Sequence, residues 1–92
     1  MTITLKAFAY YRDFLDKEKQ IDIPSDTTIE MLFKTLFAEH KGLREMILDS
    51  AGRIKPMVSI LKNGRNIVHL ENLKTVIQDG DTIALFPPVA GG

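Results

Sequence analysis

The sequence has no cysteine and only two histidines among its 92 residues. Without cysteine there is no disulfide, no thiolate nucleophile and no cysteine-based metal site, which excludes several functions that are common in small proteins. The lack of cysteine also fits a cytoplasmic location, where disulfides are rare.

A net charge of either sign and long apolar runs are also missing. Twelve basic side chains balance twelve acidic ones, so no net field draws the chain to nucleic acid or to an anionic membrane. No segment approaches the ~20 apolar residues of a membrane-spanning helix, and residues 1–6 lack the pattern of a signal peptide. We therefore expect a cytoplasmic protein with neither a nucleic-acid nor a membrane partner.

Side chains of the usual catalytic types are scarce. No Ser/His/Asp set accompanies His40 or His69, whose positions fit a helix end and a strand. Asp79 and Asp81 flank a glycine, but calcium takes roughly six or more oxygen ligands, so we expect a turn there. Isolated glycines such as Gly64 do not form a phosphate-binding loop. We expect no bound cofactor and no metal.

The composition is that of one folded domain. Hydrophobic residues make up 45% and charged residues 26%, far from the composition of disordered chains. A chain of this length buries roughly 60 to 65% of the surface that its unfolded form exposes, which leaves room for one core. We predict a single domain over residues 1–92, with residues 87–92 as an extended C-terminal tail.

Alternation of apolar and polar residues predicts two strands near the start of the chain. Residues 2–9 place Ile3, Leu5 and Ala7 on one side, and residues 20–23 alternate until a proline ends the run. About ten mostly polar residues separate them, so we predict an antiparallel hairpin with a loose turn.

A helix follows and gives the clearest signal in the chain. Residues 27–30 have the spacing of a capping box, in which a threonine hydroxyl accepts from a backbone amide and Glu30 reaches back. Apolar residues then recur as one helical stripe: Ile29, Leu32, Phe33, Leu36 and Phe37. Gly42 is the predicted stop, and residues 43–48 have the pattern of a further short helix.

The second half of the chain returns to strands. Residues 57–62 and 66–70 flank Asn63-Gly64, a preferred pair for a two-residue primed turn, and predict a second hairpin. Residues 82–86 predict a last strand. Runs of strands around one main helix indicate an α+β fold of the β-grasp type. We expect a mixed sheet of about five strands, with the helix on one face and the first and last strands parallel at its centre.

The end of the sequence is unusual on physical grounds. It consists of Pro87, Pro88, Val89, Ala90, Gly91 and Gly92. The prolines fix the backbone and direct it outward from the last strand, and the next two side chains are small. The glycines have no Cβ, so a partner can approach the terminal carboxylate closely. Glycine-rich chain ends are often idle, but prolines directly after a core strand favour a tail that enters a narrow channel.

These residues resemble a known family. The stretch from Asp79 to Gly92 is similar to the C-terminal signature of the small subunit of molybdopterin synthase, in the sulfur-carrier branch of the ubiquitin-like superfamily. The likeness extends to residues 63–65, to the capped helix and to the Tyr-Arg-Asp sequence at residues 11–13. The segment 40–56 is longer and less regular than in the shortest family members.

The resemblance implies a carrier rather than an enzyme, with Gly92 as the reacting residue. A partner related to ubiquitin-activating enzymes would use ATP to convert the Gly92 carboxylate into an acyl-adenylate. A persulfide sulfur donor would displace AMP and leave a thiocarboxylate. In the family, the tail then enters the large subunit of the synthase and gives its sulfur to a cyclic pyranopterin precursor, building half of the dithiolene that binds the metal.

The strand phases add a hypothesis about partner binding. If the apolar residues of the first and last strands face the helix, Phe8 and Phe86 share the opposite face, and parallel neighbouring strands bring them together. Two exposed aromatic side chains next to the tail would form a docking patch, which continues into residues 87–91. In the alternative, the loop after the first strand covers both aromatic rings.

Other functions would use the same tail. The chain could carry sulfur for thiamine or for thiolated transfer RNA, although the Pro-Pro pair argues against the thiamine branch. It could also be a ubiquitin-like modifier, whose activated Gly92 is attacked by a lysine amine to give an isopeptide bond. An interaction domain with an idle tail is a further alternative. Synthesis of the molybdenum or tungsten cofactor is our leading hypothesis.

Overall fold

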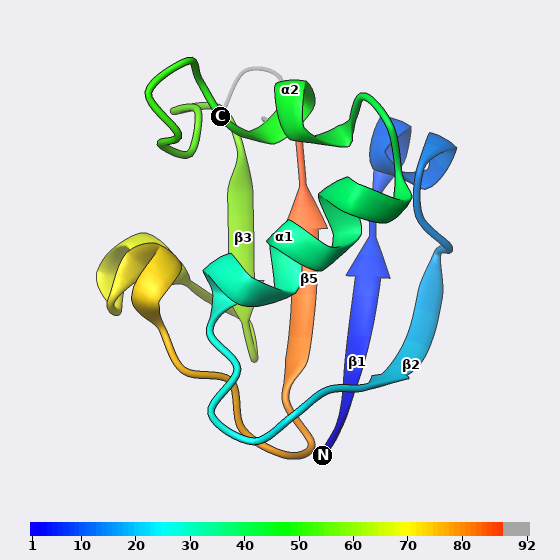
Figure 1. Ribbon diagram of the computed structural model, residues 1–92, viewed down its shortest axis with the longest axis vertical. Helices are drawn as coiled ribbons and strands as arrows, with labels where there is room; N and C mark the ends of the chain where they lie inside the picture. The colour runs from blue at the N-terminus through cyan, green and yellow to red at the C-terminus, as the bar shows by residue number, and fades with distance from the viewer. Residues whose placement is uncertain (88–92) are drawn as a thin grey trace.

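Five strands form one mixed sheet in the order β2-β1-β5-β3-β4, in a computed structural model that describes residues 1–87 (Figure 1). The strands are β1 (Thr2–Ala7), β2 (Glu18–Asp22), β3 (Ser59–Lys62), β4 (Arg65–Asn66) and β5 (Thr82–Phe86). The helices are α1 (Ile29–Glu39) and α2 (Leu43–Ile47), with 3-10 turns η1 (Ala9–Asp13), η2 (Ile67–His69) and η3 (Asn72–Lys74). Helix α1 lies across one face of the sheet.

The centre of the sheet confirms the predicted β-grasp arrangement. β1 and β5 are parallel, with Thr4 opposite Thr82 and Ala7 opposite Leu85. β2 is antiparallel to β1, and β3 is antiparallel to β5. One face of these strands and the inner stripe of α1 form the core, which contains Ile3, Leu5, Ala7, Ile29, Leu32, Phe33, Leu36, Ile60, Ile83 and Leu85.

Helix α1 begins and ends next to the predicted residues rather than at them. Thr28 is the N-cap, and its hydroxyl accepts from the Met31 amide at 3.2 Å. The hydroxyl of Thr27 instead donates to the carbonyl of Pro24. The prediction that Gly42 stops the helix is wrong: α1 ends at Glu39, and Gly42, with φ of 92°, is the N-cap of α2.

The second hairpin has the predicted turn but a much shorter second strand. Asn63 and Gly64 both have positive φ, 51° and 84°, as a primed two-residue turn requires. The predicted strand over 66–70 is wrong, because only two residues pair as β4. The Asn66 side chain accepts from the Val68 amide at 3.1 Å, and this bond turns the backbone into η2.

The first strand also stops earlier than predicted. Residues 2–9 were expected to be extended, yet β1 ends at Ala7. Ala9 has a φ of 52°, in the left-handed region, and this turn starts η1. The predicted loose connection therefore contains a 3-10 turn whose Tyr11 side chain is buried.

Asp79 and Asp81 lie in the predicted turn, directly before β5. Figure 1 shows this turn at the lower end of the sheet. The buried carboxylate of Asp81 accepts from the Asn63 side-chain amide and from the Gln78 backbone amide, both at 2.8 Å. Lys62 lies 3.5 Å from the same carboxylate. We call Lys62, Asn63, Gln78 and Asp81 the turn-end network, and its bonds join β3 to the start of β5.

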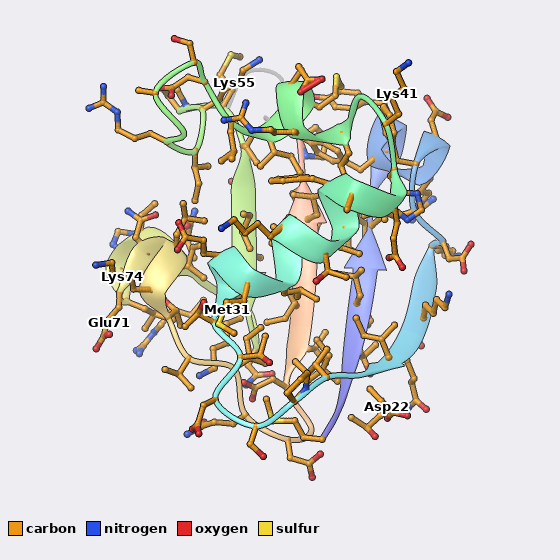
Figure 2. All side chains as sticks on the ribbon, viewed as in Figure 1. Asp22, Met31, Lys41, Lys55, Glu71 and Lys74 are labelled. Carbon is orange, nitrogen blue, oxygen red and sulfur yellow. The ribbon has the colours of Figure 1, made fainter. Side chains whose placement is uncertain are left out.

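Charged side chains lie around the outside of the molecule, as the labelled Lys41, Lys55, Glu71 and Lys74 show (Figure 2). Within residues 1–87, no helix has both the length and the apolar character needed to cross a membrane.

Candidate functional site

The tail leaves the sheet from its middle strand. The Phe8 amide donates to the carbonyl of Leu85 at 3.1 Å, which continues the parallel pairing one residue past β1. On the other side of β5, Phe86 pairs with Ser59 of β3. Because β5 is held on both sides up to Phe86, the position at which the chain enters Pro87 is fixed by backbone hydrogen bonds.

Phe8 and Phe86 lie together, as predicted. Their rings are stacked, with centroids 4.0 Å apart and planes 12° from parallel. The expectation that both are exposed is wrong, because each side chain is half-buried. Stacking itself covers one face of each ring, and each side chain keeps part of its surface exposed next to the base of the tail. We call this pair the aromatic stack.

Arg12 extends the aromatic stack and was missed as a functional candidate. Its guanidinium carbon lies 5.5 Å from the centroid of the Phe8 ring, within the range of a cation–π contact. Its Nε donates to the carbonyl of Ala7 at 2.9 Å. The η1 turn brings Arg12 back over β1, so a fixed, exposed cation borders the aromatic rings. The signal in the sequence was an arginine four residues after an aromatic residue.

Tyr11 belongs to the hydrophobic core and contributes structure rather than reactivity. Its side chain is fully buried, and its hydroxyl has no hydrogen-bond partner among the residues that the structure describes. Burial raises the pKa of the Tyr11 phenol well above its ordinary value, and the neighbouring Tyr10 raises it further. The phenol therefore stays protonated and neutral at physiological pH.

Other predicted site residues lie beyond the described part of the chain. These are Pro88, Val89, Ala90, Gly91 and Gly92, and their roles stay predictions. Pro87 is described and lies directly after the aromatic stack.

The histidines lie apart from this surface. His40 is the C-cap of α1, which confirms its predicted position at a helix end. His69 is exposed and lies in η2 rather than in the predicted strand. Across residues 1–87, no three or more histidine, aspartate or glutamate side chains lie close enough to hold a metal ion.

The side chains at the base of the tail are thus the aromatic stack and Arg12, which is held by the Ala7 carbonyl. Such a surface suits recognition by another protein. Comparison with known proteins identifies the group to which such a chain belongs. The sequence profile of the ThiS family matches residues 5–92. The chain belongs to the ThiS family. Its members are ubiquitin-like sulfur carriers, which act as carriers rather than as enzymes.

Curated relatives divide between two named roles. Small archaeal modifier protein 3 of Haloferax volcanii is 39% identical over 93 residues, covering 100% of both chains. The sulfur carrier protein CysO of Mycobacterium tuberculosis is 29% identical over 94 residues and covers 100% of both. The molybdopterin synthase sulfur carrier subunit of Aspergillus niger is 29% identical over 92 residues, covering 99% of this chain and 94% of that protein.

A solved structure confirms the ubiquitin-like β-grasp fold of this ThiS-family chain. The solution structure of a Haloferax volcanii protein with 39% identity superposes with a TM-score of 0.84, covering 100% of this chain and 87% of the other. The chain is therefore a ThiS-type sulfur carrier or a small protein modifier.

Proposed function

We propose that this protein is a sulfur carrier whose reacting group is the carboxylate of Gly92. The observation that carries the proposal is the match of the ThiS profile through residue 92, on a chain whose preceding strand is the central β5. A carboxylate at neutral pH is a poor electrophile, so a partner enzyme related to ubiquitin-activating enzymes uses ATP to form an acyl-adenylate and releases pyrophosphate.

The sulfur step then follows from the chemistry of the adenylate. A persulfide of the donor protein attacks the Gly92 carbonyl, AMP leaves, and an acyl disulfide forms. A thiol on the donor side cleaves the S–S bond and is itself oxidised to a disulfide, so Gly92 is left as a thiocarboxylate. All of the thiols belong to other proteins, which is consistent with a carrier that has no cysteine.

The folded body supplies recognition in this proposal. The activating enzyme binds the aromatic stack and the fixed Arg12, while Pro87 and the residues through Gly91 pass into its active site. A flat apolar surface with an arginine at its margin has the composition of a protein-binding hot spot. The base of the tail is held by β1 and β3, so docking of the body determines where the tail enters the enzyme.

For the acceptor of the sulfur we propose the cyclic pyranopterin precursor of the molybdenum or tungsten cofactor. The tail would enter a large synthase subunit, give up its sulfur, and return with a Gly92 carboxylate. Support comes from the tail sequence and from the similarity to the fungal molybdopterin synthase subunit over nearly the whole chain.

Protein modification is a second candidate. The small archaeal modifier protein is 39% identical over the full length of both chains, a higher identity than that of the fungal carrier subunit. In this use, a lysine amine of a target protein attacks the Gly92 adenylate or a thioester derived from it, and an isopeptide bond forms. The first activation step is the same, so the two functions are separated by their products.

Mass spectrometry of the protein from its own cells separates these products. A thiocarboxylate adds about 16 Da to the intact chain. Conjugation instead produces branched tryptic peptides in which residues 75–92 are attached to a lysine of another protein, because Lys74 is the last tryptic site. Deletion of Gly92 should abolish both products and leave the melting temperature unchanged. A Gly92 deletion variant that still restores cofactor synthesis contradicts the proposal.

A further inference from the structure

The outer strand β2 has a free backbone edge. The Ala7 amide donates to the Lys17 carbonyl at 3.1 Å, and the Ile23 amide donates to the Met1 carbonyl at 2.8 Å, so the odd-numbered residues of this segment face β1. Bonded and non-bonded positions alternate in an antiparallel pair. The N–H and C=O groups of Glu18, Gln20 and Asp22 therefore point outward. In the described sheet, β2 pairs with β1 alone.

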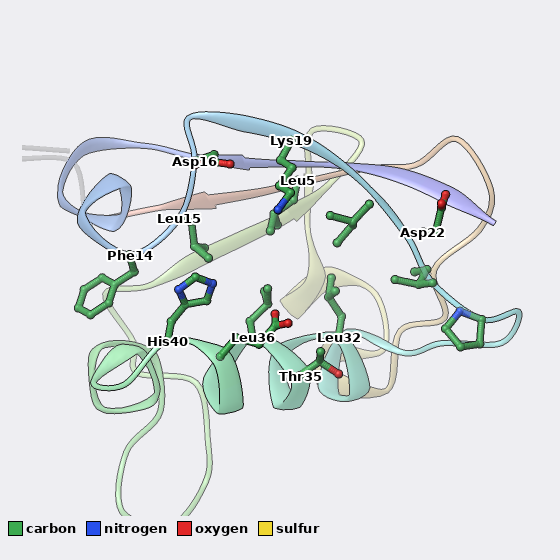
Figure 3. A pocket seen from close by; sticks show the side chains of 14 residues that line it. Leu5, Phe14, Leu15, Asp16, Lys19, Asp22, Leu32, Thr35, Leu36 and His40 are labelled. Carbon is green, nitrogen blue, oxygen red and sulfur yellow. The ribbon is translucent and has the colours of Figure 1, made fainter.

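A groove runs beside this edge, between β2 and α1 (Figure 3). It has a volume of about 460 Å³, within the range of ligand-binding clefts. Polar and apolar side chains contribute almost equally to its lining, and the apolar ones include Leu5, Leu15, Ile21, Ile23, Leu32 and Leu36. Figure 3 shows Leu32 and Leu36 projecting from the helix toward the strands.

The edge and the groove have the geometry that an added strand requires. A segment that pairs with Gln20 and its outward neighbours extends the sheet by main-chain hydrogen bonds. Every second side chain of that segment then points toward α1 and into the groove, while the others stay in solvent. The incoming segment should therefore have an apolar residue at every second position, where the side chain enters the groove.

The charges at the edge determine what can bind. Glu18 and Asp22 lie on either side of Gln20, and Asp22 occupies the outer margin of the molecule (Figure 2). If two copies of the chain paired antiparallel through Gln20, each Glu18 would lie opposite an Asp22, and like charges directly opposite are destabilising. Lysine or arginine at those positions gives attraction instead, although Glu18 already lies 3.6 Å from Lys6.

We propose that the β2 edge and the adjoining groove bind an extended segment of a partner protein, in which apolar residues alternate with polar ones and basic residues lie at both ends. Asp16 and Glu39 add negative charge at the margin of the groove. Lys19 and the imidazole of His40 also line it. β1 separates this edge from β5. The partner thus binds while the aromatic stack and the tail are occupied elsewhere, and the proposal does not depend on the chemistry of Gly92.

A synthetic peptide tests this directly. The probe is fluorescein-labelled Ser-Lys-Val-Thr-Val-Lys-Ser with blocked ends, in which both valines point into the groove when the lysines lie opposite Glu18 and Asp22. We expect binding with a dissociation constant below about 1 mM by fluorescence anisotropy. Amide shift changes in the NMR spectrum of the full chain should concentrate in residues 16–23 and 32–40. Absence of binding, or shifts confined to other residues, overturns the proposal.

Two control peptides check the recognition. Replacing both lysines by glutamate should weaken binding at least about tenfold, since like charges then face Glu18 and Asp22. Replacing both valines by serine should weaken it to a similar degree, because the groove loses its apolar contacts. Equal affinities for all three peptides overturn the proposal.

A backbone variant isolates the edge. In Gln20→Pro the lost N–H points outward, so pairing with β1 is kept while one bond to the added strand is removed. We expect binding to fall at least about tenfold, with Gln20→Thr within about twofold of the natural chain. Unchanged binding by a folded Gln20→Pro chain overturns the proposal.

A helix variant gives an independent answer if Gln20→Pro does not fold. Thr35 is exposed on α1 and lines the groove, and its hydroxyl donates to the Met31 carbonyl. Thr35→Arg places a long side chain over the groove and should abolish binding because it fills the space that the two valines enter, whereas Thr35→Ala should leave binding intact. Equal binding by these two variants overturns the proposal.

Discussion

The two ends of the central strands use their side chains in opposite ways. At the turn end, the Asp81 carboxylate is buried and its bonds go to Asn63, Gln78 and Lys62 of the same chain. At the tail end, the aromatic stack is half-buried and Arg12 is exposed. Polar groups that bond within the fold add stability, while apolar and cationic surface left half-covered is available to a partner. Variants at the two ends should therefore affect different measurements.

The largest expected effect on stability is at the turn end. Asp81→Ala leaves the Asn63 amide, the Gln78 amide and Lys62 without their buried acceptor. We expect a loss of about 3 kcal/mol in the free energy of unfolding, measured by urea denaturation, with little change in thiocarboxylate formation in cells. Asp79→Ala is the matched control: this exposed carboxylate accepts from the Thr2 amide, and its loss should cost under about 1 kcal/mol. Equal losses for the two variants would contradict the comparison.

The aromatic stack should show the reverse pattern. Phe8→Ala removes half of the stack, which should cost about 2 kcal/mol of stability and lower the fraction of thiocarboxylated chain at least about tenfold. Mass spectrometry of the intact protein measures that fraction. Tyr10→Ala removes a neighbouring aromatic ring that is 43% exposed and should leave the fraction unaltered. If both variants load sulfur normally, the aromatic stack is not a docking surface.

Arg12 should contribute less than Phe8, and its loss should lower the fraction of thiocarboxylated chain about threefold. Arg12→Gln keeps a hydrogen-bond donor but loses the charge, so association with a partner should slow, and the difference should shrink as salt is added. Lys74→Gln, on η3, removes an exposed cation of the same sign and should have no effect on loading. A salt-independent effect of Arg12→Gln would show that the arginine acts through packing alone.

The smallest effect is expected at Asp49, which is partly exposed in the segment after α2. Hydrogen bonds from the Arg53 and Ala51 amides lower the pKa of the Asp49 carboxyl below its ordinary value. Because the folded pKa is depressed, the stabilisation is complete above about pH 4 and is lost as the pH falls through the folded value. An NMR titration should give a midpoint for Asp49 below the ordinary value of an aspartate carboxyl, and an ordinary midpoint would contradict this.

The sequence was sufficient for elements whose signals are local. The stripe from Ile29 to Phe37 predicted α1, and Asn63-Gly64 predicted its turn, since helical spacing and positive φ are properties of a few neighbouring residues. The alternation of side chains along β1 and β5 also predicted that the rings of Phe8 and Phe86 lie together. The failures at residues 66–70 and at Ala9 have a local cause too: an Asn side chain bonding to a backbone amide, and a left-handed turn, ended strands that hydrophobicity alone would continue.

Features that depend on tertiary packing could not be obtained this way. Arg12 lies over Phe8 only because η1 folds back across β1, and its spacing alone does not distinguish this from an exposed loop. The groove beside β2 depends on where the axis of α1 crosses the sheet. Ile21 and Ile23 look like ordinary inward-facing strand residues in the sequence, and their incomplete burial appears only when the helix is in place.

The parallel pairing of β1 with β5 has a consequence for how the protein is made. β5 follows the other four strands in the chain, so the nascent chain holds β1 without its parallel neighbour until β5 has left the ribosome. Contacts between distant parts of a chain also form slowly. A product truncated before β5 would therefore lack both the centre of the sheet and the Phe86 half of the aromatic stack, and a partner that binds this surface would not recognise it.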